Sequence, residues 1–152
     1  MTNATRSAAV GILAVLLAIG GPAMAGPLGT APEARAMLER AVAAVKNNEA
    51  NALAAFSRGS AGFKDRDLYV FCARVDGRVD AHIDPRQVGR SMRDLYDVDG
   101  VAFGQEMMAI AQIGEIKVVS YMWPAPGSRT PAPKLTFVTK VADQICGVGY
   151  YK

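Results

Sequence analysis

Aromatic and cationic side chains lie on both sides of a proline-rich segment near the end of the chain. Residues 120–138 read SYMWPAPGSRTPAPKLTFV, in which Tyr121 and Trp123 end one predicted strand and Lys134 opens the next. Four of the ten residues from 124 to 133 are prolines, which stiffen the backbone. The ammonium of Lys134 would supply a fixed positive charge, and aromatic walls that exclude water would strengthen its pairing with a small anion.

A predicted β-hairpin carries the other candidate site residues. Residues 68–75 form an apolar run, and in residues 78–83 polar and apolar side chains alternate. Asp76-Gly77 between them is typical of a two-residue type I′ turn. This turn predicts a register in which Val75 faces Arg78, Phe71 faces His82 and Cys72 faces Ala81.

One face of this hairpin is the predicted position of the binding site. Because directly opposed residues share a face, Tyr69, Phe71 and His82 lie together, with Tyr121 and Trp123 closing the site. His82 would donate a hydrogen bond to the anion, more strongly when protonated. A plainer interpretation stays open, in which His82 is a half-buried partner of Phe71 bonded to the backbone and the other aromatics belong to the core.

Motifs for catalysis or metal binding are not evident in the sequence. It contains no nucleophile elbow, glycine-rich phosphate loop, catalytic carboxylate pair or metal-ligand cluster, so we predict no enzyme activity and no cofactor or metal. The segment LYDVDGVAFGQE matches a calcium loop at Asp97, Asp99, Gly100 and Glu106, but Leu95 occupies its first position. We therefore favour a solvated turn followed by the start of a helix.

The first 25 residues have the features of a cleaved signal peptide. Arg6 precedes an apolar run from Ala8 to Ile19, which is too short for an ordinary membrane span, and Ala23-Met24-Ala25 precedes Gly26. We predict a signal peptide over residues 1–25, a single domain over residues 26–152 and a periplasmic or secreted location. Loss of Arg6 takes the net charge from +3 to +2. With no clustered basic residues and no second apolar span, neither a nucleic-acid partner nor a membrane span is predicted for the mature chain.

The chain has two cysteines, Cys72 and Cys146, and one histidine. An even cysteine count in an exported chain predicts one structural disulfide. The alternative is a nucleophile pair between a cysteine and His82, although no motif surrounds either cysteine.

The remaining patterns predict the elements that position these side chains. Residues 30–59 are helical, as one helix or as two that meet at Asn47-Asn48, and a short helix runs from Val101 to about Ile113. Strands follow over residues 115–123, 134–141 and 144–151. On the first of them, Val119, Tyr121 and Trp123 share a face. Antiparallel strands with helices on one side make an α+β domain.

Four segments occur in an order that resembles the single Cache domain, the PAS-like extracellular sensor module of bacterial chemoreceptors and sensor kinases. They are DLYVFCARVDGRVDAH, VGRSMRDLYDVDG, YMWPAPGSRTPAPKLTFV and CGVGYY, and the resemblance covers about residues 34–152. It implies a long N-terminal helix packed on a five-stranded antiparallel sheet. It also implies a small pocket on the other face of the sheet, which takes up small organic molecules, often short carboxylates.

The resemblance also implies where the candidate residues lie relative to the pocket. The segment after Trp123 would form a rim over the pocket and lead to the strand that carries Lys134. Cys72 and Cys146 replace aliphatic residues on strands that are neighbours in the family, which implies a cross-strand disulfide. Receptors of the family continue into membrane spans and an output module, whereas this chain ends one residue after Tyr151, which implies a free-standing module.

The resulting hypothesis is an exported, free-standing, sensor-type domain that binds a small organic anion, such as a short carboxylate or a similar metabolite. The predicted ligand-binding residues are Tyr69, Phe71, His82, Tyr121, Trp123 and Lys134. The domain would buffer its ligand or present it to a membrane-bound signalling or transport partner. The alternative is an envelope interaction protein that keeps the fold without a ligand, which a filled pocket would favour.

Overall fold

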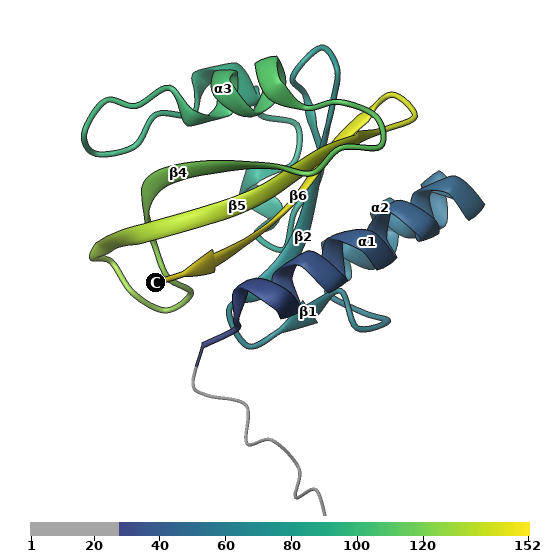
Figure 1. The fold of residues 1–152 in the computed structure, drawn as a ribbon, viewed down its shortest axis with the longest axis horizontal. Coiled ribbons are helices and arrows are strands. Elements are labelled where there is room, and N and C mark those ends of the chain that lie inside the picture. The colour runs from purple at the N-terminus through teal and green to yellow at the C-terminus, as the bar shows by residue number, and fades with distance from the viewer. Residues whose placement is uncertain (1–27) are drawn as a thin grey trace, which may run out of the picture.

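The computed structural model describes residues 28–152, which Figure 1 colours from purple to yellow. The predicted signal peptide and its cleavage point before Gly26 lie outside these described residues. The helices are α1 (Ala31–Asn47), α2 (Glu49–Arg58) and α3 (Phe103–Ile110), with short 3-10 turns η1 (Pro85–Gln87) and η2 (Met92–Asp94). The strands are β1 (Lys64–Asp65), β2 (Leu68–Arg74), β3 (Val79–Ala81), β4 (Lys117–Pro124), β5 (Pro131–Val141) and β6 (Gln144–Tyr151).

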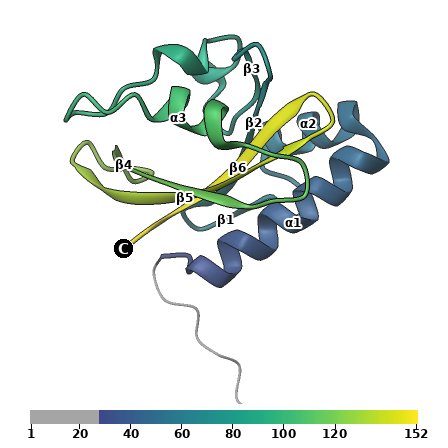
Figure 2. The ribbon, with the colours of Figure 1, turned by 45° about the horizontal axis from the view of Figure 1, so that its top comes forward.

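One antiparallel sheet organises the domain, and the predicted α+β class is confirmed. Its strands follow the order β1-β2-β6-β5-β4, and β3 pairs with β2 (Figure 2). The first long strand and the last are therefore neighbours, with Cys72 opposite Cys146. β6 matches the predicted strand over residues 144–151, and β4 begins at Lys117 rather than at residue 115.

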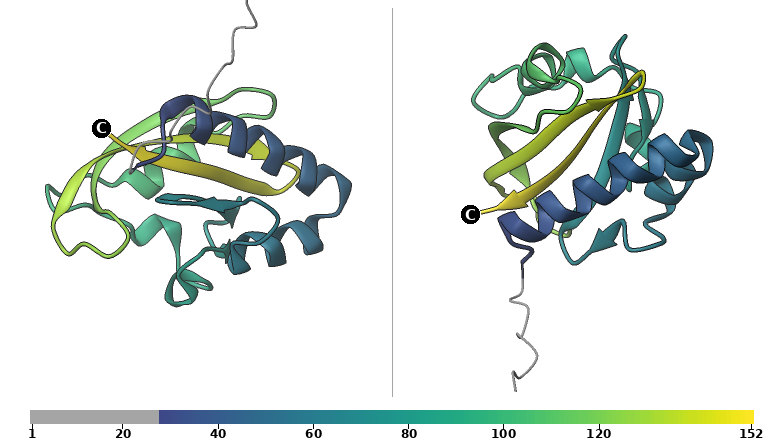
Figure 3. Two further views of the ribbon diagram at one scale, coloured as in Figure 1. Left: turned by 90° about the horizontal axis from the view of Figure 1, so that it is seen from below. Right: turned by 45° about the vertical axis from the view of Figure 1, so that its right-hand side comes forward.

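Helices cover both faces of this sheet. On one face, Leu68, Val70 and Cys72 of β2 pack with α1 and α2 in a continuous apolar core. On the other face, Phe103 and Met107 of α3 pack against β4 and β5, so the two helical layers lie on opposite sides in Figure 3. The expectation that the helices lie on one side of the sheet is therefore wrong. The central strands are apolar on both faces, and each face needs a cover.

The N-terminal helical region consists of two helices, as one of the two alternatives predicted. Asn48 ends α1 and begins α2, where its side chain accepts a hydrogen bond from the N–H of Asn51 at 3.0 Å. Asparagine is a favoured N-cap, which explains the bend at this position. The later helix, α3, is shorter than the predicted range of residues 101–113.

The β2–β3 hairpin has a wider turn than predicted. The N–H of Arg74 donates to the carbonyl of Arg78 at 2.8 Å, so three residues form the loop, and among them only Gly77 has a positive φ, of 101°. A type I′ turn needs positive φ at two residues, so that prediction is wrong, as is the pairing of Val75 with Arg78. The carboxylate of Asp76 accepts the N–H of Arg78 at 3.0 Å, a bond that favours the wider loop.

A bulge after Cys72 restores the predicted pairing of Cys72 with Ala81. The predicted faces of the hairpin are confirmed as a result. The ring centre of His82 lies 5.1 Å from that of Tyr69 and 6.4 Å from that of Phe71.

Prolines lie within the strands of the β4–β5 hairpin as well as in its loop. Pro124 ends β4, while Pro131 and Pro133 belong to β5, which leaves a loop of residues 125–130. The carbonyl of Pro133 accepts the N–H of Lys152 at 3.4 Å, so the nitrogen of Pro133 also faces the edge beyond the end of β6. A proline removes no ladder hydrogen bond at such an edge. The predicted ten-residue loop is therefore too long.

Candidate ligand-binding site

Lys134 lies in the interior of the domain. It pairs with Tyr121 of β4 on one side and with Tyr151 of β6 on the other, and the three side chains share the face that α3 covers. Only 2% of Lys134 is exposed. A lysine so deeply buried is rare without a partner for its charge.

Gly149 of β6 makes room for this lysine. A Cβ atom on Gly149 would lie 2.3 Å from Cε of Lys134, so the lysine side chain crosses β6 where that strand has no side chain. Gly147 has the same relation to Phe71, whose Cζ would lie 2.6 Å from a Cβ there. The two glycines let long side chains lie flat on the sheet.

The ammonium of Lys134 ends against two tyrosines. It donates a hydrogen bond to the hydroxyl of Tyr69 at 3.1 Å, and it lies 4.7 Å from the ring centre of Tyr69 and 5.0 Å from that of Tyr151. Burial lowers the pKa of Lys134 from 10.5 to about 8, against the opposing effect of the charge on Asp67. At neutral pH the group is therefore still largely a cation, held by aromatic faces and one hydroxyl.

Tyr69 and His82 are the donors closest to this charge. Because the Tyr69 oxygen accepts from Lys134, its own hydrogen is left for another acceptor, and burial raises the pKa of Tyr69 to about 12, which keeps it protonated. Nδ1 of His82 accepts the N–H of Asp84 at 2.9 Å, so the proton of the neutral ring sits on Nε2. Burial and the charge of Lys134 lower the pKa of His82 to about 4. His82 is thus a neutral donor at neutral pH, not the protonated donor that we considered from the sequence.

Two cavities meet at these donors. Tyr69, Phe71, His82, Tyr121 and Trp123 border an inner cavity of about 40 Å³ against α3. Tyr69, His82 and Trp123 also border an outer cavity of about 630 Å³, together with the loop of residues 125–130. Five of the six predicted site residues therefore meet around one space, and Lys134 lies behind Tyr69 without lining either cavity.

Tyr121 and Trp123 differ in their exposure to these cavities. Phe103 of α3 stacks on Tyr121 with ring centres 4.0 Å apart, and the hydroxyl of Tyr121 lies 2.9 Å from that of Thr136, so Tyr121 is mainly a core residue. Trp123 is half-buried and packs edge-on against Phe103 at 5.4 Å, with the outer cavity beside it.

Asp97 fixes one wall of the outer cavity. Its carboxylate accepts the N–H of Asp99 at 3.0 Å, of Val101 at 2.8 Å and of Met122 in β4 at 2.9 Å. These hydrogen bonds, that of Met122 first, lower the pKa of Asp97. The segment that partly matches a calcium loop thus closes around its own aspartate and is hydrogen-bonded to the edge strand β4.

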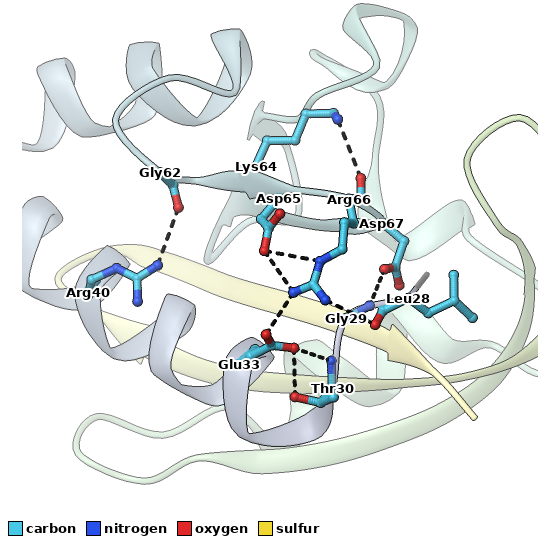
Figure 4. Close-up of polar contacts among 10 residues, drawn as sticks. All are labelled: Leu28, Gly29, Thr30, Glu33, Arg40, Gly62, Lys64, Asp65, Arg66 and Asp67. Atoms are coloured by element: carbon cyan, nitrogen blue, oxygen red, sulfur yellow. Dashed lines mark hydrogen bonds and ion pairs between the residues drawn. The ribbon is translucent and has the colours of Figure 1, made fainter. Parts of the chain in front are cut away.

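The turn between β1 and β2 anchors the start of α1 just before Tyr69 (Figure 4). Arg66 pairs with Glu33 and with Asp65, both at 2.8 Å, and donates to the carbonyl of Leu28 at 3.2 Å. The next residue, Asp67, is buried and accepts the N–H of Gly29. The N-terminal helix and β2 are therefore held together at the end of the sheet where Lys134 lies.

The disulfide between Cys72 and Cys146 is confirmed. The sulfur atoms are 2.06 Å apart and the Cα atoms 4.1 Å apart, on paired positions of β2 and β6. Both residues are buried under α1 and α2, on the face opposite the two cavities. This arrangement excludes a nucleophile pair with His82 and leaves the disulfide a structural role.

Sequence reasoning missed Gly149 and Tyr151 as neighbours of Lys134. The signal for the first was the spacing of Gly147 and Gly149 on one predicted strand, which places both on one face. The signal for the second was the short turn at residues 142–143, because a two-residue connection pairs Lys134 with Tyr151.

A sheet with helices on both faces, and a cavity bordered by neutral donors in front of a buried lysine, is an arrangement suited to holding a small molecule. The family model for single Cache domain 2 matches residues 29–151, and the chain belongs to that family. Cache sensor domains are signalling and ligand-binding modules. Among residues 28–152, no helix is both long and apolar enough to cross a membrane.

The chain is similar to parts of known chemotaxis receptors. Methyl-accepting chemotaxis protein McpP of Pseudomonas putida is 29% identical over 90 residues, which are 57% of this chain and 16% of that protein. The chain therefore spans less than a fifth of the length of this curated relative.

Solved structures agree with this assignment. A methyl-accepting chemotaxis protein from Vibrio parahaemolyticus matches with a TM-score of 0.66 and 26% identity over 79% of this chain and 86% of that one. A periplasmic sensor domain of a chemotaxis protein matches with a TM-score of 0.61 and 26% identity, over 77% and 86%. A Cache chemosensory domain described for carboxylic acid recognition shares the fold, with a TM-score of 0.59 and 21% identity over 76% and 84%.

Proposed function

We propose that this domain binds a small organic anion where Tyr69, His82 and Trp123 border both cavities. The observation that carries the proposal is the hydrogen bond from Lys134 to Tyr69. It leaves the hydroxyl hydrogen of Tyr69 for an incoming acceptor and places a buried positive charge directly behind it. Nε2–H of His82 supplies a second donor at the same place.

Electrostatics favour an anion over a neutral or cationic ligand at this position. Among the described residues, no carboxylate forms an ion pair with Lys134, whose pKa burial has lowered. The buried carboxylate of Asp67 acts on this charge without forming an ion pair with it, and a ligand carboxylate would add a second opposite charge and raise that pKa again. Hydrogen bonds to a charged group contribute about 1.5–3 kcal/mol each, which is enough to discriminate an acid from its amide.

Screening against three ligand classes tests the proposal. Thermal unfolding of the oxidised mature chain would be followed with small carboxylates, amines and purines. The proposal expects carboxylates to raise the unfolding midpoint and amines to have no effect. The second candidate function, an interaction protein without a ligand, is favoured by the small volume of the inner cavity. It expects no compound of the panel to shift the midpoint.

We also propose that the domain acts outside the cytoplasm after removal of residues 1–25. The disulfide supports this location, because disulfides persist in oxidising compartments. Intact mass measurement of protein recovered from the cell envelope should place the first residue at Gly26. Recovery of the full uncut chain from the membrane fraction would contradict the cleavage.

A further inference from the structure

The inner cavity has room for the acidic group of a ligand but not for the rest of the molecule. Its volume is about 40 Å³, whereas one water needs about 10–15 Å³. Phe103 closes it, with its ring 4.0 Å from Tyr121 and 5.4 Å from Trp123. Close aromatic packing of this kind does not open without loss of core contacts.

The outer cavity offers the space that the inner one lacks. Its volume of about 630 Å³ falls in the range of about 300–1,000 Å³ that is typical of small-molecule sites. Because Tyr69, His82 and Trp123 border both cavities, a ligand whose acidic group reaches the two donors must extend its remaining atoms into the outer cavity.

Aromatic and proline rings form much of the wall of the outer cavity. Trp123 and Tyr96 contribute aromatic rings, and Pro124, Pro126 and Pro131 contribute rigid rings from the hairpin. Rigid side chains lose little conformational entropy when they bury a ligand. A planar ring can stack on such walls, whereas a short aliphatic chain would leave most of them in water.

Charges around the outer cavity do not oppose an anion. Asp84 is paired with Arg86 at 2.8 Å, and the carboxylate of Asp97 is engaged by backbone N–H groups. Arg129 also borders this cavity, and among residues 28–152 no carboxylate forms an ion pair with it. The formal charges of these four side chains therefore cancel, and backbone N–H groups already occupy the carboxylate of Asp97.

From these features we infer that the preferred ligand is an aromatic monocarboxylate. Its carboxylate accepts hydrogen bonds from Tyr69 and His82 in front of Lys134, and its ring lies in the outer cavity against Trp123 and Tyr96. This inference rests on the proposed binding of an anion and adds the chemical class of the rest of the ligand. It excludes short aliphatic acids as the best ligands.

Calorimetric titration with three probes separates the inference from the proposed function. Benzoate should bind at least tenfold more tightly than propionate, and at least tenfold more tightly than benzamide. Propionate that binds as tightly as benzoate would overturn the inference and leave anion binding intact. Benzamide that binds as tightly as benzoate, or failure of both acids to bind, would overturn both proposals.

Substitution of Tyr96 tests where the ring lies. Tyr96 is 53% exposed, so Tyr96→Leu should leave the fold intact. It should weaken benzoate threefold or more and leave propionate unchanged. Val118→Ala, at an exposed residue that borders neither cavity, is the control. Equal effects on both acids would overturn the inference. Trp123 is the only tryptophan of the chain, so its emission should change on saturation with benzoate, and unchanged emission would also overturn it.

Discussion

Lys134 of β5 donates a hydrogen bond to Tyr69 of β2 across the intervening strand β6, over 3.1 Å. Side chains on one face of a sheet contact mainly those of the adjacent strand. A contact across a whole strand needs an open position between the partners, and Gly149 provides it. The proposed site thus depends on a glycine that touches no ligand.

Gly149→Ala should destabilise the protein by about 1–3 kcal/mol, the range for overpacking of a dense core. The new methyl group would lie 2.3 Å from Cε of Lys134 and 2.6 Å from the hydroxyl of Thr136. Urea unfolding measures the loss.

A double-mutant cycle identifies the clash as the cause. In a Lys134→Ala background the added methyl group meets fewer atoms, so Gly149→Ala should cost less there than in the wild-type protein. Equal losses in the two backgrounds would show that the lysine does not occupy the space over Gly149.

The free energy of unfolding should rise between about pH 8 and pH 10. Burial lowers the pKa of Lys134 from 10.5 to about 8, so in this window the unfolded chain holds a proton that the folded protein has released. The rise can reach about 1.4 kcal/mol per pH unit. Above about pH 10 the trend reverses, because the unfolded chain then loses tyrosine protons that residues such as Tyr69, with a pKa of about 12, retain.

Urea unfolding of wild-type protein and of Lys134→Met across this pH range checks the assignment. The variant should lack the rise. A rise of the same size in both proteins would assign it to another group.

Loss of the disulfide should lower the free energy of unfolding by about 2–5 kcal/mol. The bond joins residues separated by 74 positions and lies under α1 and α2, opposite the cavities. The double variant Cys72→Ala/Cys146→Ala should therefore be less stable to urea and still bind ligand as the wild type does at low temperature. Loss of binding without loss of stability would contradict a purely structural role.

Asp97→Asn should loosen the wall of the outer cavity. Val101 and Met122 donate to different oxygens of the Asp97 carboxylate, and asparagine keeps only one of these two acceptors. One of the two hydrogen bonds is therefore lost and the other weakened, with an expected loss of about 1–2 kcal/mol. Hydrogen exchange of these two amides should accelerate, whereas Asp99→Asn should leave them unchanged. Equal exchange in both variants would remove Asp97 from this role.

The sequence pattern predicted most of the fold, because apolar residues are concentrated on the buried faces of the helices and strands. Apolar runs in the sequence predict β2 and β6, and the pair Asn47-Asn48 predicts the bend between the two N-terminal helices. The β2–β3 turn was mispredicted, because a hydrogen bond from the N–H of Arg78 to the carboxylate of Asp76 outweighed the preference of Asp-Gly for a two-residue turn.

The site was only partly predictable. Tyr69, Phe71 and His82 follow from the hairpin register, but the position of Lys134 depends on contacts between three strands. Nothing local to Lys134 shows that it lies behind Tyr69, because that depends on the missing side chain at Gly149, far along the chain. The outer cavity is likewise formed by Asp97 and the β4–β5 loop, which meet only in the folded protein.

The central claim is that the buried charge of Lys134 supports binding of an anion. The most direct test is calorimetric titration of the wild type and of Lys134→Met with one carboxylate. That carboxylate is whichever of acetate, propionate and benzoate binds the wild type most tightly. Lys140→Met, on the same strand and bordering neither cavity, is the matched control. We predict that Lys134→Met weakens binding by about 1.5–3 kcal/mol and that Lys140→Met leaves it unchanged. Unchanged affinity in Lys134→Met, with the variant folded, would contradict the claim.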